Sequence, residues 1–168
     1  MRRRADPALA RPPAAPVHDR GRPGVRAGLP AAGVAGDGAT WAVTDKADDR
    51  LLANVGIFGL DTPRNPTGGE IGYWAHPDAR GRGVVGEAVD LVTAHAFTPV
   101  EAGGLGRHRL QIGASWTNTA SRHVAERAGF TLAGRFREDG LVGVGEERRL
   151  DDGGWYDRLV SDRPACPR

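Results

Sequence analysis

The chain of 168 residues contains a single cysteine, Cys166, so no disulfide framework can form within it. It also contains no apolar run of the length that a transmembrane helix needs. The basic start of the sequence, residues 1–4, is not followed by the apolar region of a signal peptide. We therefore expect a cytoplasmic protein without a membrane partner, of a length that suits one domain.

A surplus of charge of one sign is missing as well. The 23 basic and 21 acidic residues give a formal net charge of +2, which does not favour a nucleic-acid partner. The sequence has neither an H-E-x-x-H pattern nor paired cysteines, so we expect no metal site. The histidines of the folded part are expected to be surface or capping residues, namely His76, His95, His108 and His123.

Residues 1–38 contain no aromatic residue and show no apolar periodicity. Such a segment buries too little apolar surface to offset the entropy lost on ordering. We expect a disordered or non-native N-terminal segment, and a shifted reading frame in the gene is one explanation for it. The folded domain is then expected over residues 39–161, with a C-terminal tail over residues 162–168.

From Thr40 onward the apolar pattern becomes that of a folded domain. Alternating residues predict strands, and a spacing of three to four residues predicts helices. A strand–helix–strand unit following an antiparallel meander indicates an α+β fold with a mixed, mostly antiparallel sheet and flanking helices. The predicted order is three strands, a helix, a strand, a helix and two strands, over residues 40–44, 51–60, 70–77, 83–97, 108–115, 118–129, 130–138 and 153–160.

Three glycines between the third strand and the first helix, Gly81, Gly83 and Gly86, spell G-x-G-x-x-G. A dinucleotide site would need a strand leading directly into the first glycine and an acidic residue ending the next strand, and both are missing. A nicotinamide-dependent oxidoreductase is therefore only a remote alternative. Arg80, Arg82 and the free N–H groups of a helix start favour a site for a di- or polyphosphate. The other interpretation is a plain strand-to-helix turn with solvated arginines.

Two motifs at matching spacing resemble the GCN5-related N-acetyltransferase (GNAT) superfamily. The stretch RGRGVVGEA, residues 80–88, resembles the acetyl-CoA loop of that family. The stretch WTNTASRHVAERAGF, residues 116–130, resembles its second signature, Asn-x-x-Ser followed by a helix that ends in Gly-Phe. The resemblance covers residues 40–160 and is greatest to the RimJ/RimL-like branch, the ribosomal-protein N-terminal acetyltransferases. It implies the acyl-CoA N-acyltransferase fold.

The resemblance also implies where acetyl-CoA binds. The pantetheine arm would lie where the fourth and fifth strands of the family sheet splay apart, lined by Trp74 and Ala75 and faced by Ala114 and Ser115. Asn118 matches an asparagine that contacts this arm. The pyrophosphate would sit on the backbone N–H groups of Arg80, Gly81, Arg82, Gly83, Val84, Val85 and Gly86. Val85 departs from the family pattern, which has glycine or alanine at its position.

The implied reaction is attack of an amine on the thioester of acetyl-CoA, the co-substrate. The acceptor would be a protein N-terminus or a small-molecule amine. By analogy Glu70 is the candidate base, although it also reads as an exposed strand-end carboxylate. Ser121 is the candidate donor to the leaving thiolate, although it also reads as an ordinary first-turn helix residue. Tyr156 is an alternative donor or, as we prefer, a packed aromatic residue.

One departure leaves a second function open. Family members begin with a strand and two helices that form one wall of the amine site, and residues 1–38 show the pattern of neither. A catalytically impaired acetyl-CoA-binding domain is therefore the alternative to an active enzyme. Both a monomer and a homodimer are compatible with the sequence.

Overall fold

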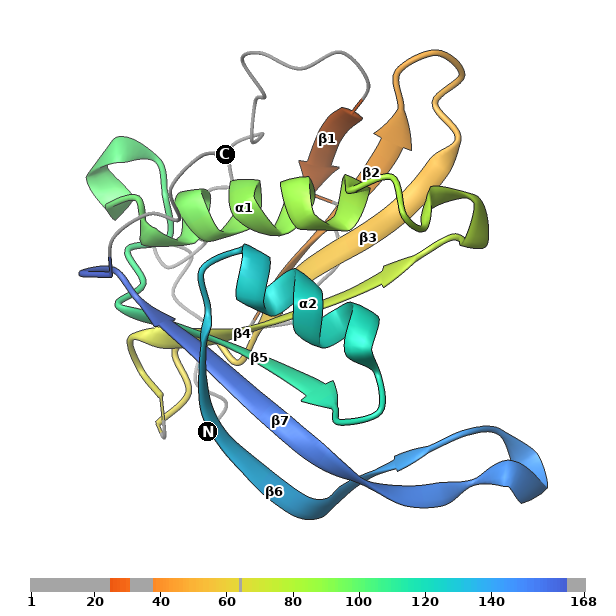
Figure 1. Ribbon diagram of the computed structural model, residues 1–168. Coiled ribbons are helices and arrows are strands. Elements are labelled where there is room, and N and C mark those ends of the chain that lie inside the picture. The colour runs from red at the N-terminus through yellow and green to blue at the C-terminus, as the bar shows by residue number, and fades with distance from the viewer. Residues whose placement is uncertain (1–24, 31–37, 64, 163–168) are drawn as a thin grey trace, which may run out of the picture.

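The computed structural model describes residues 25–30, 38–63 and 65–162. One sheet of seven strands has the order β1-β2-β3-β4-β5-β7-β6, and β4–β5 is its one parallel pair (Figure 1). This confirms the predicted mixed, mostly antiparallel sheet. The strands and α-helices are β1 (Val25–Pro30), β2 (Ala39–Asp45), β3 (Leu51–Phe58), β4 (Gly68–Ala75), α1 (Val84–Phe97), β5 (Arg109–Ser115), α2 (Thr119–Arg127), β6 (Thr131–Val142) and β7 (Arg149–Leu159).

Strand β1 corrects one expectation. We predicted no regular element within residues 1–38, yet Val25–Pro30 pairs antiparallel with β2 at the edge of the sheet. The pairing uses backbone N–H and C=O groups, which every non-proline residue has, so it needs no apolar periodicity. Residues 1–24 and 31–37, like most of the predicted tail with Cys166, lie outside the described residues.

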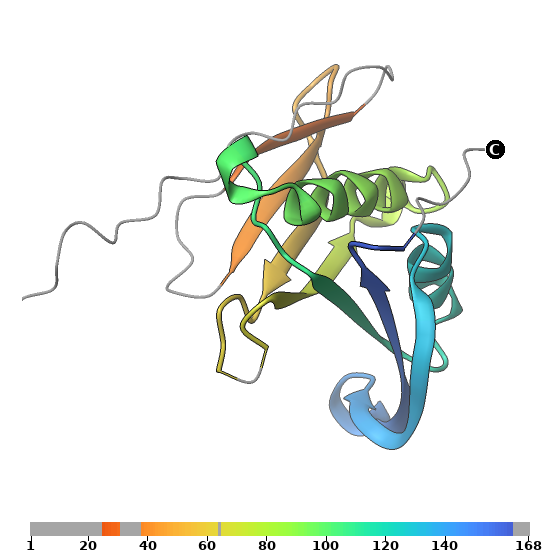
Figure 2. The ribbon, with the colours of Figure 1, turned by 90° about the vertical axis from the view of Figure 1, so that its left-hand side faces the viewer.

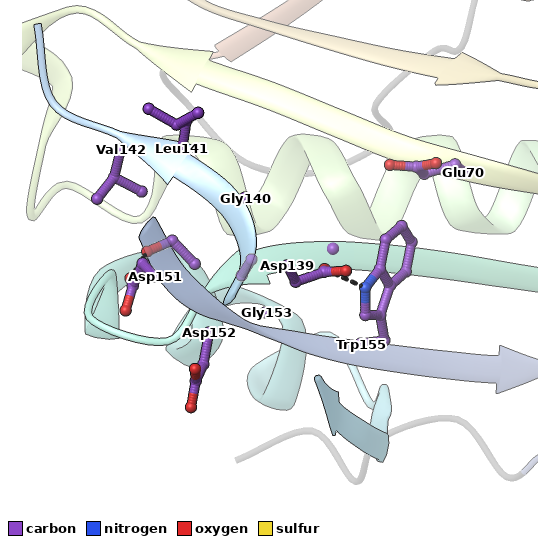
Figure 3. Close-up of a pocket in the computed structure, with 12 residues that line it drawn as sticks. Glu70, Asp139, Gly140, Leu141, Val142, Asp151, Asp152, Gly153 and Trp155 are labelled. Carbon is purple, nitrogen blue, oxygen red and sulfur yellow. Dashed lines mark hydrogen bonds between the residues drawn. The ribbon is translucent and has the colours of Figure 1, made fainter. Parts of the chain in front are cut away.

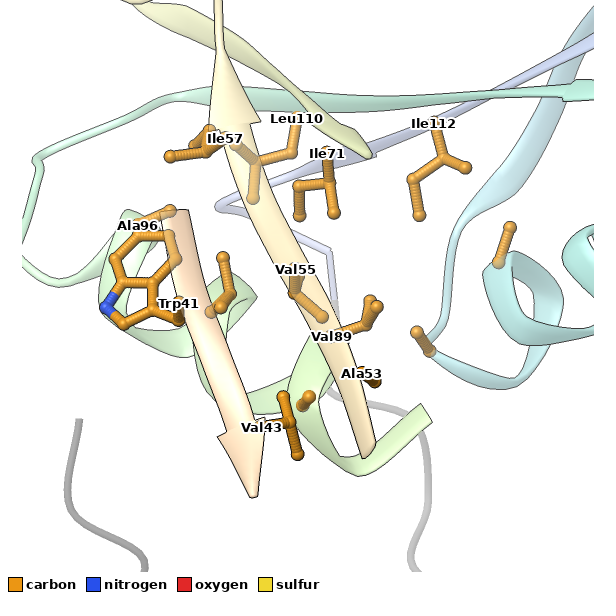
Figure 4. Packing of buried hydrophobic residues seen from close by; sticks show 14 of the residues in the cluster. Trp41, Val43, Ala53, Val55, Ile57, Ile71, Val89, Ala96, Leu110 and Ile112 are labelled. Carbon is orange, nitrogen blue, oxygen red and sulfur yellow. The ribbon is translucent and has the colours of Figure 1, made fainter. Parts of the chain in front are cut away.

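Both α-helices cover the same face of the sheet, as two perpendicular views show (Figures 1 and 2). The core lies between this face and the helices, with Trp41, Val55, Ile57 and Ile71 among its fully buried side chains (Figure 4). None of the helices in the described part of the chain has both the length and the apolar character needed to cross a membrane.

Helix α1 begins one residue later than predicted, since Gly83 is its N-cap, and it ends at Phe97 as predicted. Its buried stripe is Val84, Ala88, Val89, Val92, Thr93 and Ala96. Leu91 and His95 are only half-buried, because the centre of the stripe lies on the neighbouring residues.

Strand β4 alternates as its sequence predicts. Ile71 is buried on the helix side, whereas Glu70 and Trp74 are exposed on the other face. The ring of Phe58 lies across Gly56 and Gly72 on that outer face, because a Cβ added at either glycine would meet it. The outer face of β3 and β4 therefore exposes two aromatic side chains, Trp74 at 50% and Phe58 at 43%.

Strands β6 and β7 are longer than predicted and form a twisted hairpin that extends beyond the rest of the sheet (Figure 1). The sequence predicted a strand over residues 130–138. Instead the pairing shifts register between Phe136 and Gly140, with Glu138 at φ +51°, and then continues. This irregularity bends the hairpin alongside the outer face of the sheet.

Candidate functional site

The loop before α1 has the backbone of an anion-binding turn. Gly81 and Gly83 have φ values of +70° and +77°, in the left-handed region that favours glycine. The first hydrogen bond of α1 runs from the Glu87 N–H to the Gly83 carbonyl, at 3.1 Å. The N–H groups of residues 84–86 therefore have no partner within the helix, and they lie at the positive end of its dipole.

The third glycine of the motif is not required by the backbone. Gly86 lies inside α1 without a positive φ, and a Cβ built on it would meet nothing within 4 Å. Val85, the departure from the family pattern, packs half-buried against the core. Its branched side chain thus belongs to the helix–sheet contact, and its backbone N–H stays at the helix start.

The two arginines of the loop differ in their surroundings. The Nη2 atom of Arg82 lies 3.4 Å from Oδ2 of Asp45, the last residue of β2. A hydrogen bond from the Ala47 N–H and the nearby Arg82 hold the pKa of Asp45 below its usual value. Arg80 is exposed, and no hydrogen bond or ion pair engages its side chain within the described residues. The loop therefore has one exposed cation and one shared with a carboxylate.

The expected splay between two parallel strands is present. Strands β4 and β5 pair only over Gly68–Arg109, Gly69–Leu110 and Glu70–Gln111. Past Glu70 they have no ladder hydrogen bonds to each other, which leaves an opening in the ladder between the two strands. On the β4 side Trp74 points to the outer face, while Ala75 is half-buried. On the β5 side Ala114 is buried and Ser115 half-buried.

The start of α2 lies beside this opening. Asn118 is the N-cap, and its Oδ1 accepts a hydrogen bond from the Ser121 N–H at 3.1 Å. The hydroxyl of Tyr73, on β4, lies 3.0 Å from both the carbonyl oxygen and the Oγ of Ser121. Sequence reasoning missed this contact, because alternation within β4 indicates only that Tyr73 faces the helices.

A cavity of about 260 Å³ lies at the same opening, on the outer face of the sheet and against the β6–β7 hairpin (Figure 3). Glu70 and Ser115 line it from β4 and β5. Trp155, Asp139 and Leu141 line it from the hairpin, and the indole of Trp155 extends toward Glu70 (Figure 3). The cavity thus combines one broad aromatic surface with several carboxylates.

Two of these carboxylates are held by neighbouring donors. Asp139 accepts a hydrogen bond from Nε1 of Trp155 at 2.7 Å. Asp152 forms an ion pair with Arg135 at 2.6 Å and accepts a hydrogen bond from the Glu138 N–H. Both groups therefore shape the cavity wall.

Asp151 is held more firmly. It accepts hydrogen bonds from the hydroxyls of Ser115 and Thr117 and from the Thr117 N–H. These donors, the Ser115 hydroxyl first, lower the pKa of Asp151 to about 2. A carboxylate with so low a pKa is a weak base.

Glu70 differs from the other three. No hydrogen bond or ion pair engages its carboxylate within the described residues. Although the side chain is exposed, its partial burial by neighbouring groups raises the pKa of Glu70 above its usual value. Of the carboxylates that line the cavity it is the best suited to accept a proton. Glu70 was predicted as the base by analogy, since the sequence does not show how the hydrogen bonds of the four carboxylates differ.

Tyr156 belongs to the core. It is 1% exposed, and its hydroxyl accepts from Nε of Arg122 at 3.0 Å and donates to Oε1 of Glu126 at 3.3 Å. The preferred interpretation as a packed aromatic residue is confirmed, and the alternative role as a proton donor is wrong because the hydroxyl is enclosed and already bonded.

The histidines of the described residues have ordinary roles with one exception. His76 caps the short helix that follows β4, accepting from the Asp78 N–H. His95, expected at the surface, instead packs edge-on against Trp41 with ring centroids 5.9 Å apart, and burial lowers the pKa of His95. Across the described residues, no group of three or more His, Cys, Asp or Glu side chains is placed to hold a metal ion.

Comparison with known proteins identifies the family. The model of the acetyltransferase (GNAT) domain matches residues 6–131, and so it begins inside the segment that the sequence analysis left unassigned. The Bacillus subtilis protein YjcK, named "Probable N-acetyltransferase", is 32% identical over 105 residues, which cover 62% of this chain and 55% of YjcK. The chain spans about half the length of the curated relatives it matches.

Solved structures share the fold. The spermidine/spermine N-acetyltransferase SpeG of Vibrio cholerae superposes with a TM-score of 0.63 at 19% identity, covering 76% of this chain and 68% of SpeG. The ribosomal-protein-S5-alanine acetyltransferase of Vibrio fischeri gives 0.62 at 18% identity, covering 77% and 64%. At these identities the likeness extends to the fold alone.

Proposed function

Because the chain belongs to the GNAT acetyltransferase family, we propose that it transfers the acetyl group of acetyl-CoA to an amine. One observation carries the proposal, the opening between β4 and β5 beyond Glu70. The glycine loop and the start of α2 lie on the helix side of this opening, and the Glu70 cavity lies on its other side. Two reactants can therefore approach from opposite faces of the sheet and meet within it.

Acetyl-CoA takes the helix side in this proposal. The N–H groups of residues 81–86 receive the pyrophosphate, with the side chains of Arg80 and Arg82 adding positive charge. The Arg80 N–H, which the sequence analysis included, is already bonded to the Pro77 carbonyl oxygen at 3.1 Å. The pantetheine arm enters the opening between Trp74–Ala75 on one strand and Ala114–Ser115 on the other. Asn118 stands at the mouth of the opening, where its amide nitrogen can donate to the arm while Oδ1 keeps the helix cap.

The amine takes the cavity side. It enters as an ammonium ion, and Glu70 accepts its proton, directly or through a water molecule. The neutral nitrogen then attacks the thioester carbon, a C–N bond forms, and the C–S bond breaks to release the coenzyme A thiolate. The second proton lost by the nitrogen passes to that thiolate, which leaves the neutral amide and the coenzyme A thiol. Ser121 donates a hydrogen bond to that sulfur as its charge develops. Proximity of the two reactants supplies much of the rate enhancement in such a transfer.

The acceptor in this proposal is a cationic amine. Glu70, Asp139, Asp151 and Asp152 all line the cavity, and the Trp155 ring offers a surface that attracts cations. A protein N-terminus, as in the ribosomal-protein branch, and a small amine both meet this description. Acetylation of spermidine by SpeG and of an S5 alanine by the Vibrio fischeri enzyme illustrate the two classes.

The test measures thermal stability and thiol release with acetyl-CoA and an amine panel of spermidine and peptides with free N-termini. We expect acetyl-CoA to raise the melting temperature by mass action and thiol release to require an amine. Stabilisation without release would leave an impaired acetyl-CoA-binding domain, and a response to NADH alone would refute the family role.

Arg82→Glu should weaken acetyl-CoA binding about tenfold or more, whereas the same charge reversal at the distant, exposed Arg148 should not.

A further inference from the structure

The hydroxyl of Tyr73 connects two elements that the sequence separates by 48 positions. It lies 3.0 Å from the carbonyl oxygen of Ser121 and 3.0 Å from Ser121 Oγ. At the level of Tyr73 the strands β4 and β5 are no longer paired, since their last pair is Glu70–Gln111. The side chain therefore reaches from β4 to the start of α2 beside the opening in the sheet.

The two contacts determine how the protons are shared. A phenol carries one proton, and a carbonyl oxygen can only accept. When Tyr73 donates to the Ser121 carbonyl, only Ser121 Oγ is left to donate between the two hydroxyls. When Ser121 turns its proton elsewhere, Tyr73 can turn its own proton to Ser121 Oγ. Both arrangements keep Oγ hydrogen-bonded, and the second leaves the serine proton free for a ligand.

Ser121 is fixed on its other side as well. Its N–H donates to Oδ1 of Asn118 at 3.1 Å, so the residue is held by the helix cap and by β4 together. Burial raises the pKa of Tyr73 above its usual value, so the phenol stays neutral and remains a donor at physiological pH. Tyr73 and Ser121 are each half-buried, which shields the pair from competing water.

We propose that Tyr73 is a positioning residue for acetyl transfer, which orients Ser121 Oγ and replaces its hydrogen bond when Ser121 donates to the coenzyme A sulfur. This inference rests on the proposed function, because the role of Ser121 is assigned there. Tyr73 need not touch either reactant, and no proton leaves it. Its hydrogen bond makes Ser121 a stronger donor, since successive hydrogen bonds polarise one another.

The experiment is a double-mutant cycle on Tyr73→Phe and Ser121→Ala. Tyr73→Phe keeps the ring and should lower kcat about tenfold, with the KM for acetyl-CoA unchanged within about twofold. Ser121→Ala should lower kcat at least as much. The double variant should be no slower than Ser121→Ala alone, because Tyr73 acts through Ser121. The control is Tyr156→Phe, which removes a buried hydroxyl of the core and should cost stability while kcat is kept.

Losses that multiply in the double variant would overturn the inference, as would a Tyr73→Phe enzyme with the kcat of the wild type. An increase in KM for acetyl-CoA with kcat unchanged would also overturn it, because it would mark a packing role. A wild-type protein that releases no thiol with any amine would refute the proposed function and this inference together. Failure of the proposed function is measured as missing thiol release in the wild-type protein. Failure of this inference alone is measured in kcat and KM of the variants.

Discussion

The carboxylates of Asp151 and Glu70 line the same cavity, yet their pKa values shift in opposite directions. Asp151 is surrounded by hydroxyl and N–H donors that favour its charged form, and its pKa falls to about 2. Glu70 has no such donors within the described residues, and burial alone raises its pKa. Both carboxylates are visible in the sequence, but their different hydrogen bonding is not. Asp151 lies within hydrogen-bonding distance of the hydroxyls of Ser115 and Thr117, and Glu70 does not.

Glu70→Gln should lower kcat about 100-fold, since an amide cannot take the ammonium proton, and should leave acetyl-CoA affinity unchanged. The base acts in its ionised form, so wild-type kcat should fall as the pH drops through the raised pKa of Glu70. The measurement is a pH–rate profile, in which the variant should lack this decline. Glu101→Gln, at an exposed site, is the control. An unchanged profile in Glu70→Gln would assign the proton to another group.

The elements carry properties that no single residue has. The loop before α1 depends on two left-handed glycines and on a helix start whose N–H groups lack partners. G-x-G-x-x-G on its own could not distinguish a dinucleotide loop from another phosphate loop. The preceding meander, the gap between the third strand and Gly81, and the missing acidic residue at the end of the next strand made that distinction from sequence.

Gly83→Ala and Gly86→Ala form a matched pair within this element. Alanine at residue 83 must adopt a φ of +77°, which costs about 1–2 kcal/mol and should displace the loop and weaken acetyl-CoA binding. Alanine at residue 86 lies in the helix with open space around its Cβ, and should stabilise the protein by about 0.5–1 kcal/mol. Denaturant unfolding and acetyl-CoA titration test both. Equal effects of the two changes would contradict the assigned roles.

At the scale of the whole molecule, the β6–β7 hairpin joins the sheet through the β5–β7 ladder and through a few polar contacts at the end of that ladder. Asp151 on β7 holds the residues that follow β5, and Arg135 on β6 holds Asp152 while stacking 4.2 Å from the Trp116 ring. These contacts hold the part of the hairpin that extends past the last β5–β7 pair, Ser115–Gly153. Its cavity-forming position therefore depends on interactions between segments far apart in the chain.

The acid stability of the protein should reflect this attachment. The pKa of Asp151 is about 2 in the folded protein against 3.8 for an unperturbed group, so its contribution is complete above about pH 4 and is lost as the pH falls toward 2. Asp151→Asn should reduce the slope of unfolding free energy against pH in this window. Ser115→Ala should reproduce part of that reduction. Denaturant unfolding between pH 2 and 6 measures both, and an unchanged slope would show that the contacts do not form.

The sequence by itself determined six of the seven strands, both helices, the glycine loop before α1 and the start of α2. These features follow from local rules: side-chain periodicity, glycine conformations and the Asn118 cap act within a few neighbouring residues. Strand β1 was not predicted from the sequence, because pairing at the edge of the sheet uses backbone groups and requires no pattern of side chains.

The tertiary structure alone decided which of these residues meet. The Tyr73–Ser121 contact, the enclosure of the Tyr156 hydroxyl and the cavity between Glu70 and the hairpin join segments dozens of residues apart. Their geometry depends on where the β4–β5 pairing ends and where β6 bends. Both are set by packing across the sheet, which no local pattern encodes.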